Sequence, residues 1–161
     1  MDKRINFSLT VVFATGAFML IAYIGAAATQ ITGGTWLDYA FTADQTARLM
    51  EGYNRVDILR HRWMTTNLDL MLPIILAGFA ISIFYYCLPK RPRDILVALA
   101  VMGSVADYME NALIVSLLDG GDQYGIKATL TTAKFALILI PQFVALYLFL
   151  KQLKTRLLTR Q

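Results

Sequence analysis

Four long runs of apolar residues alternate with polar segments along the chain. The runs cover residues 9–29, 68–88, 95–118 and 130–150. A bilayer core of about 30 Å requires roughly 20 helical residues, so each run is long enough to cross a membrane. Because hydrocarbon offers no water to the backbone amides, each run should be helical. The pattern predicts an all-α polytopic membrane protein, with residues 1–161 forming a single four-helix transmembrane domain.

The polar loop at residues 30–66 carries its own helix signal. Thr42-Ala43-Asp44-Gln45 matches a capping box, in which the threonine and the glutamine three residues later satisfy backbone amides at a helix start. We therefore predict an amphipathic helix from about Ala43, with an apolar face made by Leu49, Met50 and Tyr53. This helix should lie at the membrane interface across the end of the bundle, or alternatively act as a lid over a cavity. A further helical stretch would carry Val56, Leu59 and Trp63 into the second run.

Lysine and arginine are concentrated on one side of the predicted bundle. Nine of the fifteen lie at the two ends of the chain or between the second and third runs: Lys3, Arg4, Lys90, Arg91, Arg93, Lys151, Lys154, Arg156 and Arg160. Basic flanks favour the cytoplasmic side, so both termini should be cytoplasmic and the loop at 30–66 should lie outside. We predict a multi-pass protein of the bacterial inner (plasma) membrane. The net charge of +4 then reflects contact with lipid rather than with nucleic acid.

Composition excludes several classes of protein. The chain is 57% hydrophobic and only 16% charged, which disfavours both a water-soluble globule and a disordered chain. It has one cysteine, Cys87, and one histidine, His61, so a disulfide scaffold, a zinc finger and bis-histidine haem ligation are excluded within one chain. No metal site is predicted, and no motif names a cofactor. His61 is expected to be a surface residue.

The third run contains a polar stripe. Asp107, Glu110 and Asn111 are spaced three and four residues apart, which places them on one face of a helix near mid-membrane. An acidic side chain facing lipid there costs about 2.5 to 3.5 kcal/mol, so the stripe should face the bundle interior, a cavity or a partner chain. Two carboxyl groups one turn apart favour a bound proton or cation. The alternative is that these side chains have a purely structural role, in which their hydrogen bonds fix the register of the helices.

Other polar residues can be placed at similar depths. Lys134 could reach Asp69 or Glu110, Gln142 should lie level with Asp107, and Asn67 begins the second run from the outer side. We therefore predict a ligand-binding or ion-binding site, in a pocket open to the outer side, made of Asp107, Glu110, Asn111, Lys134, Asp69, Asn67 and Gln142. A weaker candidate for binding an anionic group is the arginine cluster of the outer loop, Arg55, Arg60 and Arg62, for which a solvated helix face is the alternative.

Two short motifs carry a resemblance to known proteins. Asn67-Leu68-Asp69 with Pro73, followed by Ala106-Asp107 and Glu110-Asn111, resembles the LDxxxP plus ADxxEN pattern of small uncharacterised four-span membrane proteins of bacteria. This resemblance covers the chain from about Trp36 to Ile114 and implies the architecture only.

A second resemblance is to the MAPEG family of membrane glutathione and eicosanoid enzymes, which also have four spans. The family motif is an arginine, an asparagine, a glutamate three residues later and a proline, to which Arg62, Asn67, Asp69 and Pro73 are similar. Here an aspartate two residues after the asparagine replaces the glutamate. The resemblance implies glutathione chemistry facing the cytoplasm, whereas the predicted orientation places this loop outside.

Three functions are consistent with the sequence. The favoured one is a transport-type or binding protein that takes up a proton, a cation or a small amphiphile, as a homo-oligomer or with a membrane-protein partner, because four helices enclose little volume. The second is a membrane enzyme acting on a lipid, isoprenoid or quinone, with Glu110 or Asp107 as general acid or base and Lys134 as the charge partner. The third is an accessory subunit of a larger membrane complex.

Overall fold

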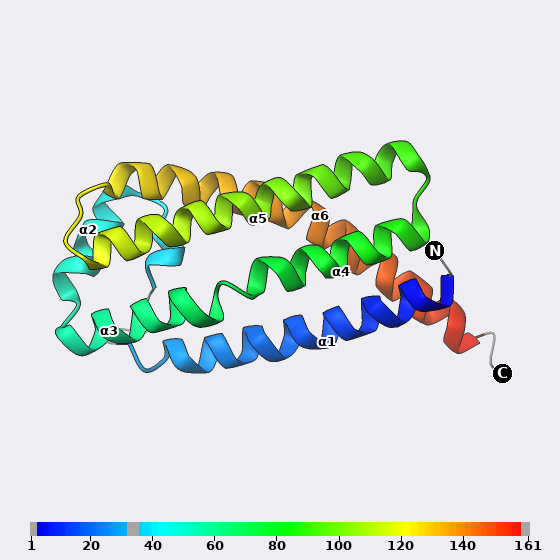
Figure 1. Ribbon diagram of the computed structural model, residues 1–161, viewed down its shortest axis with the longest axis horizontal. Coiled ribbons are helices and arrows are strands. Elements are labelled where there is room, and N and C mark those ends of the chain that lie inside the picture. The colour runs from blue at the N-terminus through cyan, green and yellow to red at the C-terminus, as the bar shows by residue number, and fades with distance from the viewer. Residues whose placement is uncertain (1–2, 32–35, 159–161) are drawn as a thin grey trace.

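The computed structural model describes residues 3–31 and 36–158, which are mainly helical and contain no strand. Four helical stretches are long and apolar enough to cross a membrane, which confirms the predicted all-α four-span bundle. They run side by side along the long axis, and α1 begins at the same end of the bundle at which α6 ends (Figure 1). The long helices are α1 (Lys3–Ala28), α4 (Leu72–Cys87), α5 (Lys90–Leu118) and α6 (Tyr124–Leu158).

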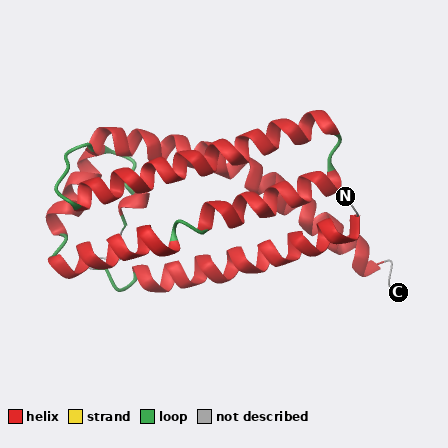
Figure 2. Ribbon diagram, viewed as in Figure 1, coloured by secondary structure: helices red, strands yellow, loops and turns green. Residues whose placement is uncertain are grey.

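Shorter helices gather at the opposite end, which we call the loop end (Figure 2). They are η2 (Leu37–Tyr39), α2 (Ala43–Gly52), α3 (Arg55–Trp63) and the π-helical turn η3 (Met64–Leu68). The predicted capping box is confirmed, because Gln45 N donates to Thr42 Oγ1 at 3.2 Å and Thr42 N donates to Gln45 Oε1 at 3.2 Å. The predicted apolar face of α2 packs into the apolar core of the loop end, and α2 itself lies against α6.

The second span is a broken helix. Its helix α4 begins at Leu72 rather than at residue 68, because Pro73 lacks an N–H and fits only the first turn of a new helix. Two backbone carbonyls beside the break accept hydrogen bonds from α5: Tyr108 Oη donates to Leu70 O at 2.8 Å, and Ser104 Oγ donates to Pro73 O at 3.2 Å. Non-helical backbone at membrane depth requires such partners.

The helix α3 confirms the prediction of a further helical stretch that leads into the second run. It continues the line of α4 on the other side of the break, so that one helical stretch, Arg55–Cys87, contains the second span (Figure 1). Its predicted apolar residues Val56, Leu59 and Trp63 are exposed on the side that faces the end of α1.

Close packing of α5 on α6 depends on a glycine. A Cβ atom added at Gly103 would lie 2.8 Å from Ile138 Cγ1 and 3.3 Å from the backbone nitrogen of Ile138. Small residues let transmembrane helices approach this closely. The contact keeps the polar faces of α5 and α6 together one turn away, where the candidate site begins.

Candidate functional site

The polar stripe of α5 faces the interior of the bundle. Asp107 is 5% exposed, Glu110 is fully buried and Asn111 is 4% exposed. Their spacing places all three on the side of α5 that packs on α6 and on the broken second span. Burial of two carboxyl groups within a span requires nearby positive charge or a bound proton.

Lys134 of α6 supplies the central positive charge. Its Nζ lies 2.9 Å from Asp107 Oδ1, forms an ion pair with Glu110 Oε2, and lies 3.9 Å from Asp38 Oδ1. The sequence predicts Asp69 or Glu110 as the partner of Lys134. The structure shows the ion pair with Glu110, and no ion pair joins Lys134 to Asp69 in the described part of the chain. One ammonium group therefore joins carboxylates from η2 and from two positions on α5.

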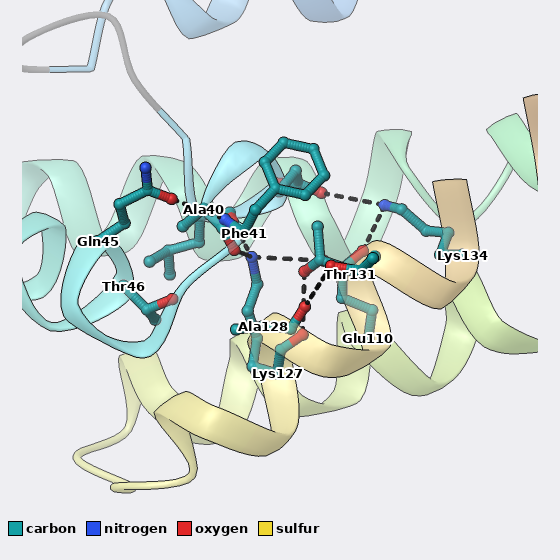
Figure 3. A network of polar contacts seen from close by, with 12 residues as sticks. Ala40, Phe41, Gln45, Thr46, Glu110, Lys127, Ala128, Thr131 and Lys134 are labelled. Atoms are coloured by element: carbon teal, nitrogen blue, oxygen red, sulfur yellow. Dashed lines mark hydrogen bonds and ion pairs between the residues drawn. The ribbon is translucent and has the colours of Figure 1, made fainter. Parts of the chain in front are cut away.

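A second lysine, Lys127, is fully buried two turns before Lys134 (Figure 3). Its Nζ donates to Leu37 O and to Ala40 O, the latter at 3.2 Å, and lies 3.4 Å from Glu110 Oε1. An ammonium group has three protons, so these three acceptors satisfy it. Thr131 Oγ1 lies between the two lysines on α6 and donates to Glu110 Oε1. Lys127 thus fastens the segment around η2 to the bundle.

Asp38 extends the network toward α3. Its carboxylate accepts from His61 Nε2 at 3.3 Å, and His61 Nδ1 forms a second hydrogen bond with Tyr53 Oη at 3.0 Å. Burial alone would raise the pKa of Asp38, but the hydrogen bond from His61 and the charge of Lys134 outweigh it and lower the pKa to about 2. Burial, together with the charges of Asp38 and Asp57, raises the pKa of Tyr53, which keeps its hydroxyl protonated.

A cavity of about 380 Å³ lies beside this network, between α1, α4 and α6. Its polar wall is formed by Asp38, Asp69, Asp107 and Lys134, and the rest of its lining is largely apolar and aromatic. Asp69 lies in the helix break and forms no ion pair within the described residues. When all of these groups are ionised, the wall has three negative charges and one positive charge.

The predicted site residues do not all reach this cavity. Gln142 is half-buried and donates to Leu76 O at 3.0 Å, so it ties α6 to α4. Asn67 is exposed on η3 and donates to Trp63 O at 2.8 Å. The structure therefore brings together four of the seven predicted residues: Asp107, Glu110, Lys134 and Asp69. Asn111 lies next to Asp69, and Asn67 lies outside the site.

The arginine cluster does not converge on a common point. Arg60 Nη1 donates to Gln30 O at 2.6 Å, Arg62 forms an ion pair with Asp119, and Arg55 is exposed. The expectation that His61 is a surface residue is wrong, since it is 1% exposed. The physical reason is that Asp38 and Tyr53 give both ring nitrogens a partner, which removes the penalty of burying them.

Sequence reasoning missed four members of the network: Asp38, Lys127, Thr131 and Tyr53. The sequence does not place Asp38 and Lys127 in the site, because their side chains meet the stripe only after the segment around η2 folds back against α6. One signal in the sequence could have placed Lys127 and Thr131 in the network, namely their spacing from Lys134 along a helix. Lys127, Thr131 and Lys134 are spaced four and three residues apart, which places them on one face of a helix extended before residue 130.

The fold and the site define a multi-pass helical membrane protein with a buried network of charges beside a cavity at its loop end. Comparison of the chain with protein-family models, curated proteins and solved structures gave no match. The two resemblances in the sequence therefore stay predictions.

The low pKa of Asp38 predicts a specific pH dependence of stability. The folded pKa of about 2 lies below the ordinary 3.8, so the ionised carboxylate stabilises the fold fully above about pH 4, and this contribution is lost as the pH falls through 2. The thermal midpoint of the wild type should exceed that of Asp38→Asn at pH 6. The difference should shrink between pH 4 and pH 2, and a constant difference over that range would contradict the assignment.

Proposed function

We propose that the protein binds a small cation, a proton or an amphiphile carrying positive charge in the cavity beside Lys134, in a binding or transport-type role. The observation that carries the proposal is the excess of carboxylates over ammonium groups on the wall of a cavity inside a four-span bundle. Uncompensated negative charge is costly in a low dielectric, so the site gains from a proton or a cation. Intramembrane acids are typical of ion and substrate pathways.

Asp69 is the residue proposed to receive the ligand. Asp107, Glu110 and Asp38 already have Lys134 as an ionic partner, whereas no ion pair joins Asp69 to a basic side chain of the described chain. Asp69 also lies where the second span is broken. Broken helices commonly form the binding sites of transporters, because irregular backbone at membrane depth must line a cavity or be buried in protein.

The proposal also includes location and assembly. The basic residues between α4 and α5 and near the end of α6, Lys90, Arg91, Arg93, Lys151 and Lys154, lie at the end opposite the cavity. By the positive-inside rule, we place that end in the cytoplasm of a bacterial cell and the cavity toward the outer side of its inner membrane. Exposed apolar faces on the spans suit lipid, a second copy of the chain or another membrane protein.

Asp69→Asn tests the proposal. Native mass spectrometry of the protein in a mild neutral detergent should find a bound species on the wild type and on the control Asp94→Asn, but not on Asp69→Asn. Asp94 is an exposed aspartate near the start of α5, paired with its neighbour Arg93 at 3.0 Å. The amide has the shape of the carboxylate without its charge, and the ion pairs of Lys134 are untouched.

The same experiment separates the alternatives. Identical adducts on all three proteins, or none on any of them, would contradict the binding of a cation or an amphiphile at Asp69. A copurifying subunit that remains bound to Asp69→Asn would favour an accessory role. An isoprenoid, quinone or lipid that the wild type chemically converts would favour the enzyme.

A further inference from the structure

We infer that the ligand of this cavity is an organic ammonium cation with an apolar body, held by aromatic rings on one side and carboxylates on the other. The inference deepens the proposed function and rests on it. Its basis is that the same cavity is lined by Trp36, Tyr39 and Phe135 as well as by Asp38, Asp69 and Asp107.

The aromatic residues form a continuous group. The ring centroids of Trp36 and Tyr39 are 5.9 Å apart, and those of Tyr39 and Phe135 are 6.0 Å apart. The electron-rich face of an aromatic ring attracts a cation within about 6 Å, and quaternary ammonium ligands are recognised by such groups of rings. Lys134 Nζ already lies 5.3 Å from the centroid of Phe135, which shows that a nitrogen cation can lie beside this ring.

The acidic wall lies against the same space. Asp38 precedes Tyr39 in the chain, and Lys134 precedes Phe135, whereas Asp69 and Asp107 come from the break in the second span and from α5. Ionised, the lining acids exceed Lys134 by two charges, which a cationic ligand would reduce. A neutral or anionic ligand would leave that excess buried.

The remaining walls are apolar and come from three helices. They include Ile21, Ile24, Leu72, Leu76, Ile138 and Leu139. A hard inorganic cation such as Ca²⁺ needs six or more oxygen ligands, and these walls offer none. An ammonium group carrying carbon substituents is weakly hydrated, and its apolar body would gain from the hydrophobic lining. A volume of about 380 Å³ is in the range of small-molecule sites.

Tryptophan fluorescence can test this inference directly. The chain has two tryptophans, and Trp63 is half-exposed on α3, so Trp63→Phe leaves Trp36 as the only reporter, inside the cavity. The full-length protein in a neutral detergent would be titrated with benzyltrimethylammonium and, separately, with its uncharged carbon isostere neopentylbenzene. We expect a saturable change in Trp36 emission with the ammonium compound and a response at least tenfold weaker with the isostere.

Two variants in this background assign the response to the site. Phe135→Leu should weaken binding of benzyltrimethylammonium by roughly threefold to thirtyfold, the range of a cation–π contact. Asp69→Asn should weaken it at least tenfold. Tyr147→Leu is the matched control, because Tyr147 is an exposed aromatic residue of α6 that does not line the cavity, and its affinity should match the background.

Equal binding of the isostere, or equal affinity of Phe135→Leu and Tyr147→Leu, would overturn the inference. So would an absence of any response to the ammonium compound. If a bound species that depends on Asp69 is still found by mass spectrometry, the proposed function survives and only the ligand class is wrong. If neither experiment shows dependence on Asp69, both fail together.

Discussion

Replacing Lys134 with methionine is expected to destabilise the folded protein by about 3–5 kcal/mol, the usual cost of breaking a buried ion pair by removing one partner. Methionine keeps the length of the side chain and removes its charge. Asp107 and Asp38 would lose an ionic partner, and Glu110 would keep only Lys127. An unfolding titration in mixed micelles measures the change as a loss of free energy of unfolding.

The control is Lys154→Met, on the exposed end of the same helix, which should change stability by less than about 0.5 kcal/mol. Adding Asp107→Asn to Lys134→Met should recover part of the loss, because Asp107 forms no other ion pair within the described residues and the amide removes its charge. If Lys134→Met is as stable as Lys154→Met, the ion-pair network does not hold the bundle together.

Replacing Lys127 with methionine is the second large effect expected, at about 2–4 kcal/mol, since it takes charge-assisted hydrogen bonds from buried acceptors. The carbonyls of Leu37 and Ala40 each lose a donor, and both residues are essentially unexposed. Lys127 holds the segment around η2 against α6 through these two backbone carbonyls, so the damage should be local. Backbone amides of residues 36–52 should exchange faster, while those in the middle of α5 keep their protection.

Hydrogen exchange followed by mass spectrometry distinguishes the two lysines. Lys134→Met should lower protection across α5 and α6, whereas Lys127→Met should affect the segment around η2 and α2 first. A uniform loss of amide protection across the protein in Lys127→Met would contradict the inference that Lys127 stabilises only the segment around η2.

The two lysines and Asp69 have different roles in this account. Lys127 and Lys134 neutralise acids that the fold itself has buried, which is a structural task. Asp69 is the carboxylate on the cavity wall for which the described chain provides no such neutralisation. The proposed ligand therefore binds where the internal ion pairs end.

Most of the architecture was predictable because it depends on local features of the chain. Apolar runs of bilayer length must be helical, and four of them give the four-span bundle. The start of α2 follows from Thr42 and Gln45, whose hydrogen bonds span only three residues. The inward orientation of Asp107 and Glu110 follows from their spacing and from the cost of exposing them to lipid.

The sequence by itself thus determined the number of spans, the helix cap in the loop and the existence of a buried acidic stripe. Only the tertiary structure decided which cations meet that stripe and what lies beside it. Asp38 and Asp107 are 69 positions apart, and both reach Lys134 only because the segment around η2 folds back onto α6. The rotation of each helix and the path of a loop depend on the packing of all the elements together, so a periodic pattern along one helix does not specify them.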